Sequence, residues 1–360
     1  MTLIKYKNKF LLNSIFSSLG IVSFPAFANS NVQIFGVMDM GISHYKVSGG
    51  QSLTVLSDSG NTTNRIGFRG QEDLGNGVKV IFWLEGGFIP SSPANSFNFV
   101  RRSVVGFSGD FGQLTLGRDF TPGYSLHSTF GGPFGTNGVA DNLVYRARVL
   151  MHSSVNANQS DSYVRSSNAI TYVSPKTNGI YSQFMYSFNE QKKSKAGRYI
   201  GGRLGYVNKN FDISAAYNEV SSGETDSGLL RNKVKGFGFG ASYSFLSNSK
   251  IVLLYVDDDV QMANGDKNLK GLSVGFDKRL GKGVLKTGMS YVRFNHFLDN
   301  SKAMKYSLGY VYDLSKRTVL YSSIGYIKNS KGAKFVVNAA VEGKANASSS
   351  GVDFGIRHNF

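Results

Sequence analysis

The sequence contains no cysteine, only 6 prolines and, after its first 28 residues, no long apolar run. The lack of cysteine excludes disulfides as the source of stability, so the fold needs a continuous hydrogen-bonded framework. The longest later apolar run, residues 251–256, has six residues, whereas a helix needs about 20 to cross a bilayer. If the chain crosses a membrane, it must therefore do so with strands.

Residues 1–28 have the pattern of a secretory signal. Three lysines stand among the first ten residues, an apolar stretch follows over residues 10–24, and Ala26-Phe27-Ala28 supplies small side chains. We expect cleavage after Ala28. Residues 29–360 contain no linker, low-complexity segment or second core, so we predict a single domain there.

The charge is strongly basic, with 40 Lys and Arg against 23 Asp and Glu. A basic exported protein could bind nucleic acid, a polyanionic surface, or anions in transit. Part of the excess is typical of solvated loops, as at Lys192, Lys193 and Lys195. No basic stripe with interleaved aromatic residues is present, so we expect no nucleic-acid partner.

From residue 31 onward, apolar and polar residues alternate with a period of two. In the first segment the apolar residues of one side are Val32, Ile34, Met38, Met40 and Ile42. The pattern returns over residues 211–218, 236–245 and 272–277. This period predicts strands. A soluble β-sandwich alternates as well, so alternation alone does not identify the solvent on each side.

The length and spacing of the segments distinguish a soluble β-sandwich from a membrane barrel. The segments run about ten residues, which a tilted strand needs to cross a bilayer, and number about sixteen. Short connections fall at residues 72–77, 109–112, 174–179, 208–210, 247–249, 281–283 and 315–317. Longer ones fall near residues 46–61, 90–97, 120–162, 191–197, 220–232, 259–268, 297–302 and 329–347. An even number of strands with short turns on one side and long loops on the other predicts an all-β, antiparallel, closed transmembrane barrel.

Several stretches resemble the general porins of β-proteobacteria and Neisseria. They are residues 65–70 (RIGFRG) leading into 72–75 (EDLG), 84–88 (LEGGF), 105–112 (VGFSGDFG), 116–118 (LGR), 312–318 (YDLSKRT) and 355–360 (GIRHNF). Each is weak alone, but their order and spacing cover nearly all of the chain after residue 28.

The resemblance implies a sixteen-stranded barrel that assembles as a homotrimer in the outer membrane of a Gram-negative cell. It implies passive diffusion of small hydrophilic solutes and ions, contact with outer-membrane lipid and lipopolysaccharide, and no cofactor. It further implies that the terminal Phe360 is recognised by the barrel assembly machinery, although a plain lipid-facing role is compatible with this.

The longest connection, residues 120–162, corresponds in such porins to a third outer loop that folds inward and narrows the pore. Its segment Gly131-Gly132-Pro133-Phe134-Gly135 resembles the sharply bent part of that constriction loop. A structureless surface loop of this length is unusual in a compact domain, which also favours a functional loop.

Strand parity predicts which charges line the lumen. Ile66 and Phe68 are expected to face lipid, so Arg65 and Arg69 face inward. By the same reasoning, Arg101 shares the inward side with Ser103, and Arg165 with Ser167 and Thr171. Related porins carry a ladder of basic residues on the wall at the positions matched by these four arginines. Clustered guanidiniums concentrate anions, unless they pair with acids and merely stiffen the wall.

Few acidic residues are placed to offset these arginines. Cation-preferring relatives carry acids on the inward loop, but this chain has none between Phe120 and Ala140. Glu85, inward by parity, offsets one arginine at most. We therefore predict that the pore prefers anions.

Arg102 and Arg118 fall on the outward parity, beside Val104 and Leu116. An arginine facing lipid at mid-bilayer costs roughly 2–4 kcal/mol. We therefore expect both to meet a neighbouring subunit. A strand bulge that shifts the parity is the competing explanation.

Other function classes find less support. His127 and His152 lie in the long loop with serines nearby, but no histidine stands in a recognisable catalytic motif, so we expect no enzyme. The triplet Asp257-Asp258-Asp259 could hold a divalent cation, yet consecutive carboxylates are more often a solvated turn, and no metal site is predicted. A closed barrel that binds partners through its outer loops remains the alternative to a pore.

Overall fold

The computed structural model describes residues 31–92, 97–153, 163–189, 198–221, 233–246, 248–261, 265–295 and 300–360. The predicted signal segment, residues 1–28, lies outside these ranges. No helix among the described residues is long and apolar enough to cross a membrane.

Nearly all regular structure is β. The strands are β1 (Asn31–Val47), β2 (Ser52–Asp58), β3 (Arg65–Gly75), β4 (Val78–Gly87), β5 (Asn98–Gly109), β6 (Gly112–Phe120), β7 (Arg165–Val173), β8 (Ile180–Ser187), β9 (Tyr199–Val207), β10 (Phe211–Ser221), β11 (Lys233–Phe245), β12 (Ser249–Gln261), β13 (Lys267–Leu280), β14 (Gly283–Asn295), β15 (Lys302–Asp313), β16 (Thr318–Ser330) and β17 (Ser349–Asn359). Two helices, α1 (Pro122–Phe130) and α2 (Leu143–Ser153), stand between β6 and β7.

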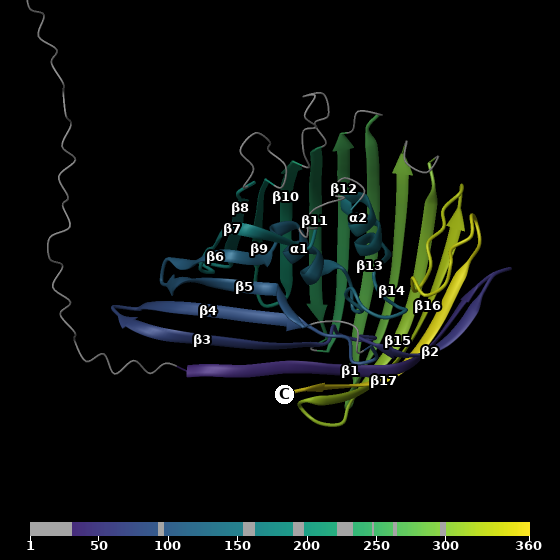
Figure 1. The fold of residues 1–360 in the computed structure, drawn as a ribbon, viewed down its shortest axis with the longest axis horizontal. Coiled ribbons are helices and arrows are strands. Elements are labelled where there is room, and N and C mark those ends of the chain that lie inside the picture. Colours follow the sequence, from purple (N-terminus) through teal and green to yellow (C-terminus); the bar gives the residue numbers. More distant parts are fainter. Residues whose placement is uncertain are drawn as a thin grey trace, which may run out of the picture.

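Every strand pairs antiparallel with its neighbours, and the sheet closes on itself (Figure 1). On one edge β1 pairs with β17, as in Gly41 opposite Gly355. On the other edge its first half pairs with β3, as in Gln33 opposite Arg69. The closed ring therefore consists of β1 and β3 to β17, which is sixteen strands as predicted.

The short turns follow the local sequence. All seven predicted short connections join consecutive strands of the ring. In the β3–β4 turn, Asn76 and Gly77 both have positive φ values, 52° and 76°. A tight hairpin with this backbone geometry favours Asn-Gly, because Gly has no side chain to clash and Asn tolerates the left-handed region.

One predicted loop is wrong in part. Residues 52–58, placed within the first long loop, form β2, which pairs with the second half of β1, as in Ile42 opposite Leu56. The loop is reduced to a tight turn after Val47 and to residues 59–64. Asp39 holds this second piece by accepting hydrogen bonds from the backbone N–H of Asn61 at 2.9 Å and of Thr62 at 2.6 Å.

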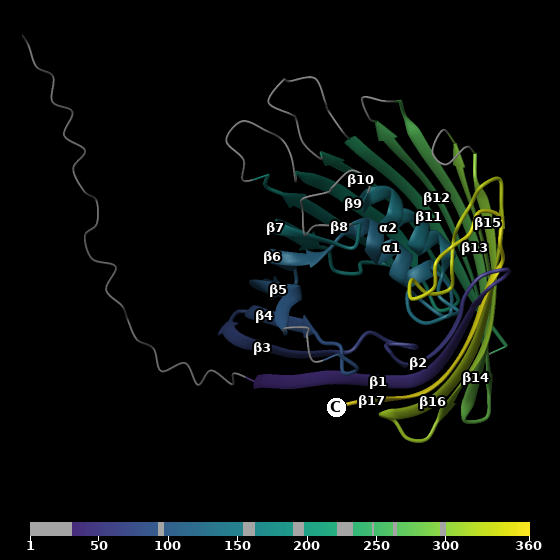
Figure 2. The same cartoon turned by 45° about the vertical axis from the view of Figure 1, so that its right-hand side comes forward.

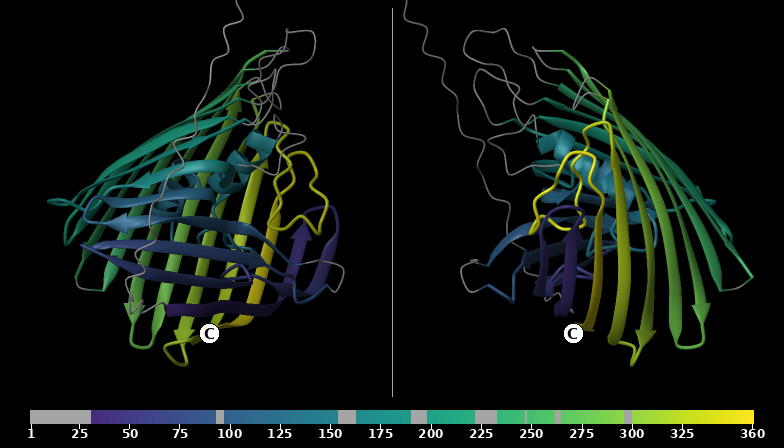
Figure 3. Two further views of the ribbon diagram at one scale, coloured as in Figure 1. Left: turned by 60° about the vertical axis from the view of Figure 1, so that its left-hand side comes forward. Right: turned by 90° about the vertical axis from the view of Figure 1, so that its right-hand side faces the viewer.

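The outer face of the barrel is apolar, unlike the surface of a soluble protein, whereas the inner face carries buried polar side chains beside the apolar ones that pack against the loops. On β1, Ile34 and Ile42 project from the outer face and are exposed, whereas Asp39 and Ser43 point inward and are buried. The last long loop, residues 331–348, lies beside the β1–β2 hairpin (Figure 3), where Asn338 donates a hydrogen bond to the Tyr45 hydroxyl at 3.2 Å.

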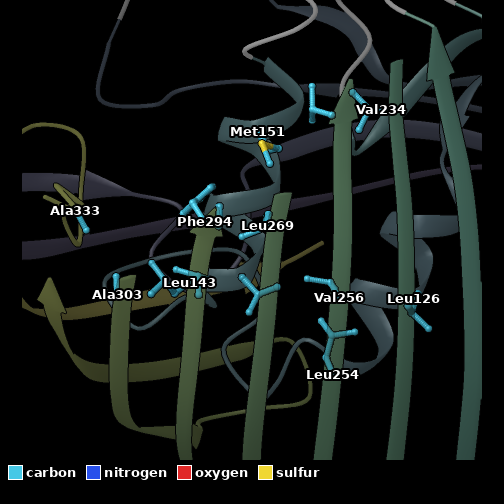
Figure 4. Close-up of a cluster of buried hydrophobic side chains, with 14 of the residues drawn as sticks. Leu126, Leu143, Met151, Val234, Leu254, Val256, Leu269, Phe294, Ala303 and Ala333 are labelled. Carbon is cyan, nitrogen blue, oxygen red and sulfur yellow. The ribbon is translucent and has the colours of Figure 1, made fainter. Parts of the chain in front are cut away.

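Helices α1 and α2 lie against the inner wall rather than above the barrel (Figure 2). Inward glycines make this approach possible. A Cβ on Gly240 of β11 would lie 2.2 Å from the Phe130 ring, and one on Gly271 of β13 would lie 2.9 Å from Val144. The resulting buried cluster (Figure 4) joins helix and strand side chains, among them Leu126, Leu143, Met151, Val234, Val256, Leu269 and Phe294.

Candidate functional site: the barrel lumen

A cavity of about 450 Å³ separates α1 from the wall formed by β3, β4 and β5. Its lining residues are Arg65, Glu85, Arg101, Phe120, Tyr124, Ser125, Ser128, Thr129 and Arg203. Helix α1 contributes hydroxyl groups and the opposite wall contributes guanidiniums. The cavity thus brings together two of the four predicted wall arginines, Arg65 and Arg101.

Glu85 is the carboxylate in this cavity. It accepts a hydrogen bond from Arg101 Nε at 2.7 Å and lies 3.9 Å from Arg65 Nε. The indole N–H of Trp83 also donates to it, at 3.2 Å. One carboxylate thus lies close to two guanidiniums, which leaves one positive charge uncompensated.

A bulge explains how Arg101 reaches Glu85. In the β4–β5 ladder, Glu85 lies opposite Arg102 and Gly87 lies opposite Asn98. An advance of two residues along β4 therefore corresponds to four residues along β5. Extra residues in a bulge lose their ladder partners and redirect their side chains. Arg101 and Arg102 therefore both point into the barrel, although they are adjacent in the sequence.

Arg165 and Arg203 have no carboxylate within ion-pair distance among the described residues. The Arg165 guanidinium lies 4.6 Å from the centre of the Phe120 ring, which borders the cavity. Arg203 donates to the Ser214 hydroxyl at 3.0 Å and to the Tyr181 hydroxyl at 2.8 Å. Sequence reasoning missed Arg203, although strand alternation places it opposite the exposed Leu204 and therefore inward.

Arg69 lies apart from the other predicted wall arginines. It lines a second cavity of about 380 Å³, together with Gln33, Trp83 and Arg102. Its guanidinium donates to the Gln33 side chain at 2.8 Å and lies 5.0 Å from the Trp83 ring. The predicted ladder is thus divided between two cavities.

The predicted outward orientation of Arg102 is wrong. On β5, Val105 and Phe107 are 52% and 48% exposed on the outer face, whereas Val104 is 6% exposed on the inner face. Arg102 shares the inner face and pairs with Asp119 at 2.8 Å. The bulges in β5 and β6 shift the parity, so Arg102 faces the lumen and not a neighbouring subunit.

Arg118 does lie on the outer side of β6, with the exposed Leu114 and Leu116. It donates hydrogen bonds to the Val100 carbonyl and, at 2.7 Å, to the Ser167 hydroxyl. These contacts use part of the hydrogen-bond donors of the guanidinium, which stays on the outer surface.

The segment Gly131–Gly135 shapes the bend of the long loop and does not line the larger cavity. Gly132 and Gly135 have positive φ values of 94° and 60°. Lys286 of β14 donates to the Pro133 carbonyl at 2.7 Å, and a Cβ on Gly275 of β13 would lie 2.4 Å from Pro133. The bend is therefore pressed against the wall opposite the arginines.

Comparison with known proteins agrees with this geometry. The family described as Gram-negative porin matches residues 16–332. The chain belongs to the Gram-negative porin family. It is 34% identical over 347 residues to outer membrane porin protein 32 of Delftia acidovorans, covering 93% of this chain and 95% of the relative. Major outer membrane protein P.IB of Neisseria meningitidis serogroup A is 24% identical over 368 residues, covering 95% of this chain and 98% of that protein.

Solved structures give the same fold. An anion-selective porin from Comamonas acidovorans matches with a TM-score of 0.82 and 31% identity, covering 92% of this chain and all of that one. OmpT of Vibrio cholerae, solved in a trimer form, has a TM-score of 0.67 and 14% identity, covering 92% of this chain and 99% of that one; it supports the fold alone. The chain is thus a porin of the outer membrane that acts as a passive channel.

Buried ion pairs anchor the loop of this porin. Arg148 of α2 donates two hydrogen bonds to Asp258 of β12, at 2.6 and 2.7 Å, and one to the Tyr163 hydroxyl at 2.8 Å. Burial alone would lower the pKa of Arg148, but the Asp258 carboxylate outweighs burial and raises it. A second anchor, Asp141, binds Lys305 of β15 and Arg146 of α2.

The aspartate triplet is therefore not a solvated turn. All three residues lie within β12; Asp258 points inward to Arg148, and Asp257 lies 3.4 Å from Lys270. Within the described ranges, no group of three His, Cys, Asp or Glu side chains could hold a metal ion.

The loop histidines are structural. Neither ring nitrogen of the fully buried His127 has a hydrogen-bond partner among the described residues, and burial lowers its pKa to about 3, so it is neutral. His152 lies 3.3 Å from Asp258. Among the described residues, neither histidine is hydrogen-bonded to a serine hydroxyl.

The terminal Phe360 completes ring closure. Its backbone exchanges two hydrogen bonds with Gly36 of β1, at 3.0 and 3.1 Å. Its ring covers Gly36 so closely that a Cβ there would lie 2.2 Å away, and the side chain is 46% exposed on the outside.

Proposed function

We propose that this porin is an anion-preferring diffusion channel for small hydrophilic solutes. The observation that carries the proposal is the charge around the two lumen cavities. Five arginines line them, namely Arg65, Arg69, Arg101, Arg102 and Arg203, and a sixth, Arg165, lies against the ring of Phe120, which borders one of them. The carboxylates that pair with these arginines are Glu85 and Asp119, so six positive charges against two negative ones leave an excess of four.

The physical consequence follows from the permanence of these charges. Arginine does not release its proton in proteins, so the excess persists at every physiological pH. Charges of one sign in a narrow gap with low-dielectric walls raise the local concentration of the opposite ion. The similarity to an anion-selective porin from Comamonas acidovorans supports the same direction. The open cavities favour a pore over a closed barrel that acts through its loops.

The protein acts as a homotrimer; the position of Arg118 on the apolar outer face supports a subunit contact there. Its apolar outer face contacts outer-membrane lipid and lipopolysaccharide. Exposure of the Phe360 ring is compatible with recognition by the barrel assembly machinery. Catalysis forms no part of the proposal.

Ion replacement in planar bilayers tests the proposal. The conductance of the purified trimer is measured in potassium chloride, then with chloride replaced by gluconate, and separately with potassium replaced by N-methylglucamine. We expect the chloride replacement to reduce the conductance more. A larger reduction on replacing potassium would overturn the anion preference.

A further inference from the structure

The second lumen cavity, of about 380 Å³, is distinct from the larger cavity between α1 and the wall. It is lined by Gln33, Arg69, Ile81, Trp83, Arg102 and Gln113, among others, and shares no lining residue with the larger cavity beside α1. Asn31 at the start of β1 and Gln113 near the start of β6 also border it, which places it toward the short-turn end of the barrel. A solute that has passed α1 therefore meets this cavity before it leaves by that end.

The cavity presents unused capacity to bind an anion. Arg69 uses its Nε on Gln33, and no carboxylate lies within ion-pair distance of it among the described residues. Arg102 uses one terminal nitrogen on Asp119, and its Nε is buried, so its other terminal nitrogen is the donor left for a ligand. A guanidinium binds a carboxylate with two parallel hydrogen bonds, so the unused N–H donors of these arginines can bind one more carboxylate.

The same cavity has an aromatic and aliphatic wall. The Arg69 guanidinium lies 5.0 Å from the centre of the Trp83 ring, and the Arg102 guanidinium lies 4.7 Å from it. The Phe35 ring packs edge-on against the indole, with 5.1 Å between the two ring centres. Ile81 and Val104 add aliphatic surface. Chloride would use only the guanidiniums, whereas a flat apolar body would also bury surface against this wall.

We propose that this cavity is a binding site for small aromatic carboxylates, with Arg69 and Arg102 binding the carboxylate and Trp83, Ile81 and Val104 contacting the ring. A volume of about 380 Å³ is within the range of small-molecule pockets, and it suits a single ring with one carboxylate. The inference deepens the proposed anion preference, since the same positive wall draws the ligand into the lumen.

Trp83 supplies a direct readout, because it is the only tryptophan of the chain. Its fluorescence is titrated with benzoate in the detergent-solubilised trimer, with acetate and cyclohexanecarboxylate as comparison ligands. We expect a saturable change with benzoate, a weaker response to cyclohexanecarboxylate, and half-saturation by acetate at a concentration at least about tenfold higher, because acetate lacks the ring.

Variants then assign the contacts. Arg69→Gln and Arg102→Gln should each raise the half-saturating benzoate concentration about tenfold, as expected for losing one charge-assisted hydrogen-bonded contact. Arg279→Gln is the matched control, because Arg279 is half exposed and pairs with Asp313 on the far wall. It should leave the titration unchanged.

The wild-type titration needs no variant and decides the proposal even if a variant does not fold. A non-saturating response, or equal responses to benzoate and acetate, would overturn the site. So would unchanged saturation in a folded variant that lacks both arginines. Ion replacement distinguishes failure of the benzoate site from failure of the proposed anion preference. A trimer that still prefers anions but does not bind benzoate would retain the proposed function and lose only this site.

Discussion

Glu85 accepts a hydrogen bond from Arg101 at 2.7 Å in the wall of the lumen. Because Arg65 lies only 3.9 Å from the same carboxylate, one negative charge is shared by two guanidiniums. Glu85 thus offsets part of the positive charge in the cavity beside α1.

Replacing Glu85 by Gln should increase the preference for anions. The amide oxygen can still accept from Arg101, while the negative charge is lost. One unit charge about 8 Å from the ion path in a water-filled gap changes the local ion energy by roughly 0.5 kcal/mol, so chloride entry should rise about twofold and potassium entry fall by a similar factor. The reversal potential of this variant should shift in the anion direction; a shift toward cations would contradict the role assigned to Glu85.

Replacing Arg203 by Gln should have the opposite effect. Arg203 lines the cavity beside α1 and, among the described residues, donates hydrogen bonds to the Ser214 and Tyr181 hydroxyls. Its loss leaves no buried acid unpaired, so the barrel should fold normally while chloride permeability falls by roughly twofold. Arg279→Gln on the distant wall is the control for general surface charge. Equal effects of the two substitutions would show that position in the lumen is irrelevant.

Replacing Arg148 by Met should destabilise the packing of α2 on the wall. The substitution leaves the Asp258 carboxylate buried without its partner, and breaking a buried pair in this way costs about 3–5 kcal/mol. Unfolding in denaturant should begin at a lower concentration, and single-channel recordings should become noisier. The double variant Arg148→Met with Asp258→Leu should recover much of the loss. No recovery would mean that the hydrogen bond to Tyr163 is the more important anchor.

Replacing Gly240 by Ala should push α1 into the pore. The added Cβ would lie 2.2 Å from the Phe130 ring, which must move away from β11. Overpacking of this kind costs about 1–3 kcal/mol, and here it narrows the channel, so single-channel conductance should fall. Gly288→Ala is the matched control, because its Cβ would meet Phe134 at 3.8 Å, an ordinary contact. Unchanged conductance in the Gly240 variant would show that α1 does not limit the passage.

Acid should weaken the packing of α1 through His127. Its pKa of about 3 in the folded chain lies below the ordinary value of 6.5, because burial and the nearby Arg148 disfavour the charged ring. Between these pH values the unfolded loop binds the extra proton, so this contribution to stability is complete above pH 6.5 and is lost as the pH falls toward 3. The variant His127→Leu should lose less stability over that range, as measured by thermal unfolding. Equal slopes for both proteins would contradict the burial of His127.

The comparison of sequence and structure shows where pattern reasoning fails. Period-two alternation and the spacing of turns predicted a sixteen-stranded ring, because a membrane barrel imposes one apolar face on every strand. Parity failed at Arg102, because the bulge opposite Glu85 and Gly87 adds residues to β5 and places Arg101 and Arg102 on the same side. A bulge leaves no simple mark in one sequence.

Other parts of the lumen depended on contacts distant in sequence. Arg69 and Arg65 stand four residues apart on β3, yet they line different cavities. The anchor between Arg148 and Asp258 joins residues 110 positions apart, so no local pattern could predict it. The inward orientation of Arg203 could have been predicted from the sequence, because alternation alone places it on the side opposite to Leu204.

The reversal potential of the wild-type trimer across a potassium chloride gradient tests the central claim most directly. An excess of four guanidinium charges around the lumen cavities should make chloride the more permeant ion, so the potential should take the sign of an anion-preferring pore. A potential of the opposite sign would show that these arginines do not control which ions pass.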